Sequence, residues 1–247
     1  MAKNTETPRI IEAITLLDPN AAILATDHNP ESATDLLVVG EMPRDVYIEK
    51  LNESAILAHF TRKRSDDALI ITADNGSACG VAYYEQKLFS TRIQAIAMGR
   101  EVDPIVKPWS VGPWLPEAFA ADLSQAHVLR SNPAVEKKVA HFTNYPEGMR
   151  QGILQRCIEE ITIKANRMGR TAETVKDLAF TQTAADICMA GIRVAHARER
   201  VYFRGLRYVD ETIPKLSEGG RAIASELSTT ANYRVALELI NLGSRQQ

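Results

Sequence analysis

The sequence lacks the features that most often mark a secreted or membrane protein. Its three cysteines, Cys79, Cys157 and Cys188, are an odd number and form no CxxC pair, which argues against structural zinc and favours reduced thiols. No apolar run approaches the roughly eighteen residues that a membrane helix requires, and the N-terminus has no apolar signal region. We therefore expect a cytoplasmic protein with no membrane partner.

The sequence also has no excess of either charge. Its 29 basic and 31 acidic residues give a formal net charge of -2, so the whole chain has no bulk attraction for nucleic acid. It contains no GxxxxGK[ST] phosphate loop, Rossmann glycine fingerprint, GxSxG elbow or HExxH pair, which excludes several common enzyme classes. The composition is 45% hydrophobic and 24% charged, as in a globular protein, and 247 residues are enough for two domains.

The first part of the chain has the pattern of a mixed α/β domain. A helix is predicted over 9–17, and Arg44–Leu51 is predicted to cross between strands. The sequence Asp74-Asn75-Gly76 is typical of a hairpin turn, and apolar spacing returns to the helical period over Lys87–Arg100. The predicted strands are 21–25, 35–39, 55–61, 67–73 and 79–85.

A proline-rich segment over 104–116 separates this part from the rest. It indicates a rigid, non-helical connector. Trp109 and Trp114 within it are typical of a packed domain interface, although they could also stack on a base or ring. We therefore predict one domain over 1–103 and another over 117–247.

The last part of the chain has helical spacing throughout. One apolar stripe recurs at intervals of three and four residues, and a break is predicted at Tyr145 and Pro146. The predicted fold class is α+β, with an N-terminal mixed α/β sheet domain followed by a C-terminal helical bundle. The stripe consists of Met149, Ile153, Cys157, Ile161 and Ala165. The predicted helices are 116–130, 134–167, 171–204 and 220–242.

The polar loop between the first two predicted strands ends in Ser32-Ala33-Thr34-Asp35. Two aspartates separated by one residue would project from the same face of a strand, so both could reach a metal ion. Nucleotidyl transfer uses such carboxylates to hold two Mg²⁺ ions against a triphosphate.

The segment Ser32–Val39 resembles the second half of the metal motif of polymerase-β-like nucleotidyltransferases, which reads Ser-Asp-x-Asp followed by apolar residues. Trp109–Leu123 and Ala197–Leu216 look like segments of the small-molecule branch, which contains antibiotic-modifying members. The resemblance implies a nucleotidyltransferase-like sheet followed by helices. It also implies Mg²⁺-dependent transfer of a nucleoside monophosphate from a nucleoside triphosphate to a hydroxyl of a small-molecule acceptor.

The resemblance places Ala33 at the first metal position and Asp35, the catalytic candidate, at the second. Asp27 and Glu85 are the candidates to complete the metal site, while Thr26, in place of the family's Gly-Ser, and Ser32 are candidates for nucleotide binding. The three carboxylates have simpler interpretations: Asp27 is typical of a turn, Asp35 could cap a helix or end a strand, and Glu85 could be an exposed strand-end charge.

A basic stripe is predicted if 182–207 is one helix. Arg193 and Arg200 on this face could bind a nucleotide's phosphates, because a guanidinium group matches phosphate oxygens. The alternative is a surface paired with Asp186 and Glu199, with His196 as a structural hydrogen-bonding residue. The stripe consists of Arg193, His196, Arg200, Arg204 and Arg207.

Three functions are compatible with these patterns. The first is an active nucleotidyltransferase. The second is a protein that keeps the fold without the chemistry and binds a nucleotide, a metabolite or a protein partner, which Ala33 favours. The third, a nucleic-acid-binding module that uses the basic stripe, is disfavoured by the slightly acidic chain.

Overall fold

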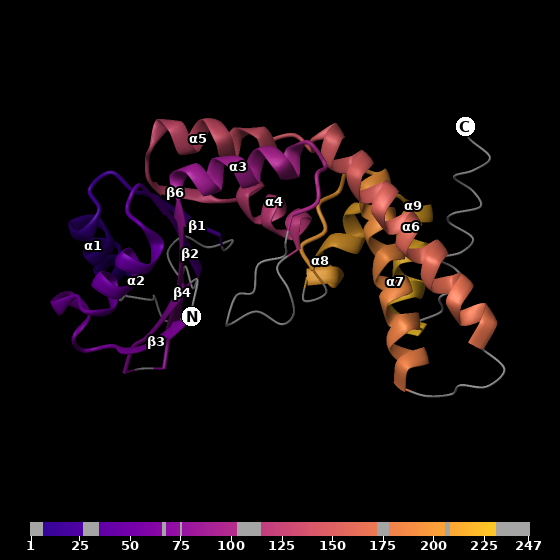
Figure 1. Cartoon of the computed structure of the whole chain (residues 1–247), viewed down its shortest axis with the longest axis horizontal. Coiled ribbons are helices and arrows are strands. Elements are labelled where there is room, and N and C mark those ends of the chain that lie inside the picture. Colours follow the sequence, from indigo (N-terminus) through magenta and orange to yellow (C-terminus); the bar gives the residue numbers. More distant parts are fainter. Residues whose placement is uncertain are drawn as a thin grey trace. The chain divides into compact units, whose positions relative to one another are not determined.

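The computed structural model describes seven stretches of the chain, and the chain forms two compact units. The first unit comprises Met1–Ile96 and Val102–Asn144, and the second comprises Ala97–Glu101 and Tyr145–Gln247. Figure 1 shows the helices and strands of both units. The described residues are 7–26, 35–65, 68–74, 76–102, 115–171, 178–205 and 208–230.

The first unit contains a six-stranded mixed sheet in the order β3-β4-β5-β2-β1-β6. The central pair, β2 and β5, is parallel, and the other neighbouring pairs are antiparallel. The fold is therefore mixed α/β. The strands are β1 (Ala22–Ala25), β2 (Asp35–Gly40), β3 (Thr61–Ser65), β4 (Ala68–Thr72), β5 (Ala78–Glu85) and β6 (His127–Arg130).

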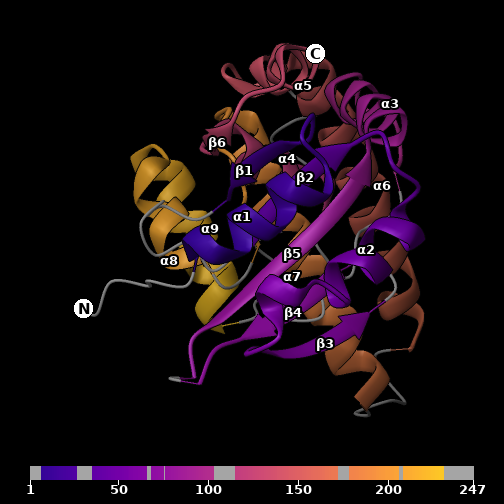
Figure 2. The ribbon, with the colours of Figure 1, turned by 90° about the vertical axis from the view of Figure 1, so that its left-hand side faces the viewer.

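Helices cover both faces of this sheet (Figures 1 and 2). On one face, α1 (Thr7–Leu17) and α2 (Arg44–Asn52) bury Ile14 and Tyr47 against strand residues such as Val38. On the other face, Tyr84 of β5 lies 6.1 Å from Phe89 and 5.9 Å from Phe119, measured between ring centroids. Phe89 belongs to α3 (Gln86–Ala97) and Phe119 to α4 (Pro116–Ser124). Alternate strand residues therefore face opposite helix layers.

Most of the predicted elements of the first part are confirmed. The helix predicted over 9–17 is α1, and α3 follows Glu85. The strands predicted over 21–25, 35–39, 67–73 and 79–85 correspond to β1, β2, β4 and β5, with residue 67 outside the described residues. The antiparallel pair β4–β5 is joined by a turn in which Gly76 has a φ of 79°, and the Gly76 amide donates to the Ala73 carbonyl at 2.9 Å. Glycine adopts this left-handed conformation without steric cost. Asn75 lies outside the described residues.

Two predicted elements are wrong. Where a strand is predicted over 55–61, Ala55–Leu57 forms a short 3₁₀ helix, η2, and β3 begins only at Thr61. Leu57 and Phe60 both reach the core from this turn, so the apolar run reflects burial rather than a strand. The helix predicted over 116–130 ends at Ser124, and 127–130 instead adds β6 to the sheet beside β1.

The remainder of the first unit continues past β6. Asn132 caps α5 (Pro133–Val139), because its Oδ1 accepts hydrogen bonds from the Ala134 and Val135 amides at 3.1 and 3.4 Å. A 3₁₀ helix, η3 (Ala140–Phe142), follows. Residues 117–144, predicted within the helical domain, thus lie in the sheet-containing unit.

The second unit is built from helices. It contains α6 (Glu147–Thr171), α7 (Leu178–Arg198), α8 (Val209–Thr212), a 3₁₀ helix η5 (Ile213–Lys215) and α9 (Glu218–Thr230). The break at Tyr145 and Pro146 is confirmed, since α6 starts just after it. The predicted stripe from Met149 to Ile161 is buried, and α7 contacts both α6 and α9. None of the described helices is both long and apolar enough to cross a membrane.

Glycines allow a close backbone crossing within this unit. A Cβ added to Gly152 of α6 would lie 2.7 Å from Gly99 Cα, and one added to Gly148 would lie 2.7 Å from the Ala97 carbonyl oxygen. Gly99 has a φ of 71°, and its carbonyl accepts a hydrogen bond from Arg156 Nη1 at 2.5 Å. The three glycines therefore let segment 97–101 lie directly against α6.

Candidate functional site

The structure brings two of the predicted site residues together where β1 ends and β2 begins. The Thr26 amide and hydroxyl both donate to the Asp35 carbonyl oxygen, at 3.1 and 3.4 Å. Thr26 is buried and Asp35 is half-buried. Asp27, Ser32 and Ala33 lie outside the described residues.

The register of the parallel strands β2 and β5 determines which residues of β5 lie beside Asp35. Asp35 is aligned with Gly80 of β5, and Ala78 lies on the same face two residues earlier. Cys79, between them, is buried in the core on the opposite face. The described start of β5 therefore brings no carboxylate beside Asp35.

Glu85 lies at the other end of the same strand pair. It is aligned with Gly40, so five residues of strand separate it from the level of Asp35, a distance of about 16 Å at roughly 3.3 Å per residue. Its Oε1 accepts a hydrogen bond from the amide of Arg44, the first residue of α2, at 3.2 Å. Glu85 thus caps α2 and is not placed to share a metal ion with Asp35.

The described residues do not fit a two-magnesium centre. The described parts of β1, β2 and β5 contribute one carboxylate, Asp35, to the end where Thr26 lies. Nowhere among the residues that the structure describes do three or more His, Cys, Asp or Glu side chains gather closely enough to hold a metal ion. Mg²⁺ bound to a triphosphate needs several oxygen ligands from the protein and the substrate together.

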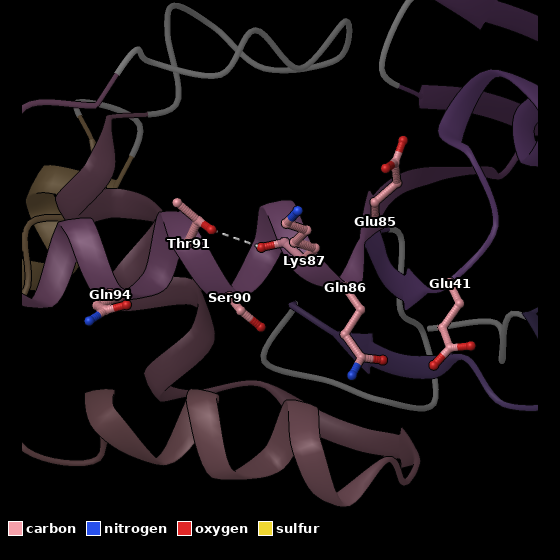
Figure 3. A pocket seen from close by; sticks show the side chains of 7 residues that line it. All are labelled: Glu41, Glu85, Gln86, Lys87, Ser90, Thr91 and Gln94. Atoms are coloured by element: carbon pink, nitrogen blue, oxygen red, sulfur yellow. Dashed lines mark hydrogen bonds between the residues drawn. The ribbon is translucent and has the colours of Figure 1, made fainter.

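A pocket of about 500 Å³ opens at the carboxyl ends of β2 and β5 (Figure 3). We call it the switch-point groove. Glu41 directly follows β2, Glu85 ends β5, and the remaining lining residues come from the first three turns of α3. The groove is lined by Glu41, Glu85, Gln86, Lys87, Ser90, Thr91 and Gln94.

The turn that carries Glu41 is held from β5. The Tyr83 hydroxyl donates to the Met42 carbonyl at 2.8 Å, and Glu85 accepts from the Arg44 amide. Tyr83 stacks on Tyr47 with 3.9 Å between ring centroids. Burial, followed by the nearby Asp18 carboxylate, raises the pKa of the Tyr83 hydroxyl above its ordinary value, so this hydroxyl remains a donor at neutral pH.

The predicted basic stripe is not continuous, because α7 ends at Arg198 rather than at 204. Arg193 is half-buried on α7. Arg200 lies beyond the helix with a φ of 57°, and its Nη2 is 3.1 Å from Glu147 Oε2. The Arg204 side chain is buried. Its Cζ lies 4.2 Å from the Tyr208 ring centroid, and its Nη1 lies 3.7 Å from Glu211 Oε2. Arg200 and Arg204 therefore already have partners within the second unit, and Arg207 lies outside the described residues.

His196 is a structural hydrogen-bonding residue, which is the alternative to a place in the basic stripe. It is fully buried; its Nδ1 is 2.9 Å from the Ile192 carbonyl oxygen and its Nε2 is 3.0 Å from the Thr212 hydroxyl. Burial lowers its pKa, so the ring is neutral at physiological pH.

Sequence reasoning found Glu85 but missed the rest of the switch-point groove. A signal was present, since Gln86, Ser90 and Gln94 recur at the four-residue interval that places polar side chains on one face of a helix. Trp109 and Trp114 lie outside the described residues. No protein-family model matches this chain, and no curated protein matches it either.

Proposed function

We propose that this chain is a ligand-binding protein with a nucleotidyltransferase-like sheet that does not itself transfer nucleotidyl groups. The observation that carries the proposal is the register of β2 and β5, which aligns Asp35 with Gly80 and places Glu85 at the opposite end. A single carboxylate cannot arrange two Mg²⁺ ions around a triphosphate. Ala33, at the position of the family's first aspartate, adds to this argument.

The proposed arrangement is a nucleotidyltransferase-like sheet unit together with a helical unit. This assignment depends on the resemblance of Ser32–Val39 and on the mixed sheet with helices on both faces. Fold and chemistry are separable in such proteins, because activity depends on a few side chains at one end of the sheet.

An active nucleotidyltransferase is the second candidate, and the adjacency of Thr26 and Asp35 favours it. In that case Asp35 holds the metal ion, and the missing carboxylates come from 27–34, outside the described residues. The substrates are then a nucleoside triphosphate and a small-molecule hydroxyl.

Restoring the missing carboxylate distinguishes these candidates. Ala33→Asp places a second aspartate two residues before Asp35, a spacing that suits two ligands on one strand face. We expect calorimetry to show no Mg²⁺ binding by the wild type and measurable Mg²⁺ binding by Ala33→Asp. The matched control is Ala134→Asp, which adds an equal charge at an exposed position of α5, beyond the end of β6 that pairs with the start of β1, at the opposite end of the sheet from Asp35. Wild-type binding of Mg²⁺ that is abolished in Asp35→Asn would support the enzyme instead.

A further inference from the structure

The chain path opens a crevice at the carboxyl ends of β2 and β5. After β2 the chain enters α2, whose Tyr47 and Ile48 pack in the core on one face of the sheet. After β5 it enters α3, whose Phe89 packs against Tyr84 on the other face. When two neighbouring parallel strands are followed by helices on opposite faces of the sheet, a crevice forms at the carboxyl ends of the strands. Open α/β sheets bind their ligands in this crevice. The switch-point groove occupies this position.

The side chains of the groove present a row of hydrogen-bonding groups. Glu41, Gln86, Ser90 and Gln94 point to the same side in Figure 3, whereas Glu85 points away toward the start of α2. None of these four side chains hydrogen-bonds another residue in the part of the chain that the structure describes. From Gln86 to Gln94 the row is about 12 Å long at 1.5 Å per helical residue.

The charged and hydrogen-bonding side chains that line the switch-point groove favour a positively charged ligand. The lining contains two carboxylates, Glu41 and Glu85, and one ammonium group, Lys87, so it is net negative and disfavours phosphates and other anions. In Figure 3, Lys87 points away from the row, as Glu85 does, and Glu41 is the charged group that lies with the row. Six of the seven lining side chains carry acceptor oxygens, and only Lys87 is purely a donor. An acceptor-rich, net negative row is complementary to a donor-rich cation.

We propose that the switch-point groove binds a small organic cation that carries one or more ammonium groups, with Glu41 as the charged recognition residue. Glu41 is presented by the turn that Tyr83 and Glu85 hold in place, so little ordering accompanies binding. The inference goes beyond the proposed function, because the groove lies at the opposite end of β2 and β5 from Asp35. It is tested independently of any nucleotide chemistry.

Three four-carbon probes of similar size test the proposal on the full-length protein: putrescine, 1,4-butanediol and succinate. Dissociation constants are measured by ligand-observed NMR at low ionic strength. We expect putrescine to bind at least tenfold more tightly than butanediol, and succinate not to bind. Equal binding of succinate and putrescine, or no binding of putrescine, would overturn the proposal.

A pair of variants locates the site. Glu41→Gln keeps the shape of the side chain and removes its charge, so putrescine binding should weaken about tenfold or more. Glu49→Gln removes one charge from an exposed position on α2 outside the groove and should leave binding unchanged. Both variants should keep the wild-type unfolding temperature, since both positions are exposed. Equal effects of the two variants would show a general charge effect and contradict the assignment of Glu41.

Discussion

At the scale of single residues, the two stacked tyrosines beneath the β2–α2 turn differ in one hydrogen bond. The Tyr83 hydroxyl donates to Met42, whereas the buried Tyr47 hydroxyl has no hydrogen-bond partner among the described residues. We expect Tyr83→Phe to lower the free energy of unfolding by about 1 kcal/mol, and Tyr47→Phe to leave it unchanged or raise it by up to about 1 kcal/mol. Urea unfolding measures both. A loss in Tyr47→Phe as large as in Tyr83→Phe would mean that Tyr47 has a hydrogen bond after all.

His196 couples the stability of the second unit to pH. Its pKa is lowered by burial in the folded protein from an ordinary value of 6.5, so the unfolded chain takes up its proton first as the pH falls. Above about pH 6.5 the His196 ring is neutral in both the folded and the unfolded chain, so its protonation costs the folded state nothing. Below that pH, protonation of the unfolded chain lowers the free energy of unfolding, by at most about 1.4 kcal/mol per pH unit.

The measurement is the urea midpoint at pH 8 and pH 5 for three proteins. The wild type and His141→Gln, a control at an exposed position, should lose stability toward pH 5 by similar amounts. His196→Gln should lose less over the same interval, whatever its stability at pH 8. An unchanged pH dependence in His196→Gln would show that other groups carry the effect.

At the scale of elements, the close crossing of 97–101 over α6 makes two helical glycines respond oppositely to alanine. An added Cβ at Gly152 meets the backbone of Gly99, while Gly219 in α9 has no atom within 4 Å of such a Cβ. We expect Gly152→Ala to lower the free energy of unfolding by about 1–2 kcal/mol, because neither backbone can move away easily. Gly219→Ala should raise it by up to about 1 kcal/mol through helix propensity. Thermal unfolding tests both, and stabilisation by Gly152→Ala would disprove the close approach.

The predictable elements were those in which local pattern and tertiary packing agree. The strand at 35–39 and the stripe of α6 show the periods of a buried strand and an amphipathic helix, and both are confirmed. β6 was missed because it is an edge strand whose residues are exposed or half-buried, so it shows no apolar alternation. The early end of α7 was missed because the arginine spacing continues past it, although Arg200 has already left helical backbone geometry.

At the scale of the whole molecule, the site was less predictable than the fold because it depends on which strand ends meet. Glu85 and Glu41 are far apart in the sequence, and only the parallel pairing of β2 and β5 brings their positions to one edge. The same pairing separates Asp35 from Glu85, which spacing along the chain could not reveal. Strand-end acids can be recognised from sequence, but the register that groups them cannot.

The most direct test of the central claim is calorimetric titration of the wild-type protein and Asp35→Asn with ATP, GTP, CTP and UTP, each with and without Mg²⁺. If the Asp35 end has no metal centre, Mg²⁺ will not increase the affinity for any of the four nucleotides, and Asp35→Asn will behave like the wild type. Mg²⁺-dependent binding that is lost in Asp35→Asn would contradict the account and identify an active nucleotidyltransferase site.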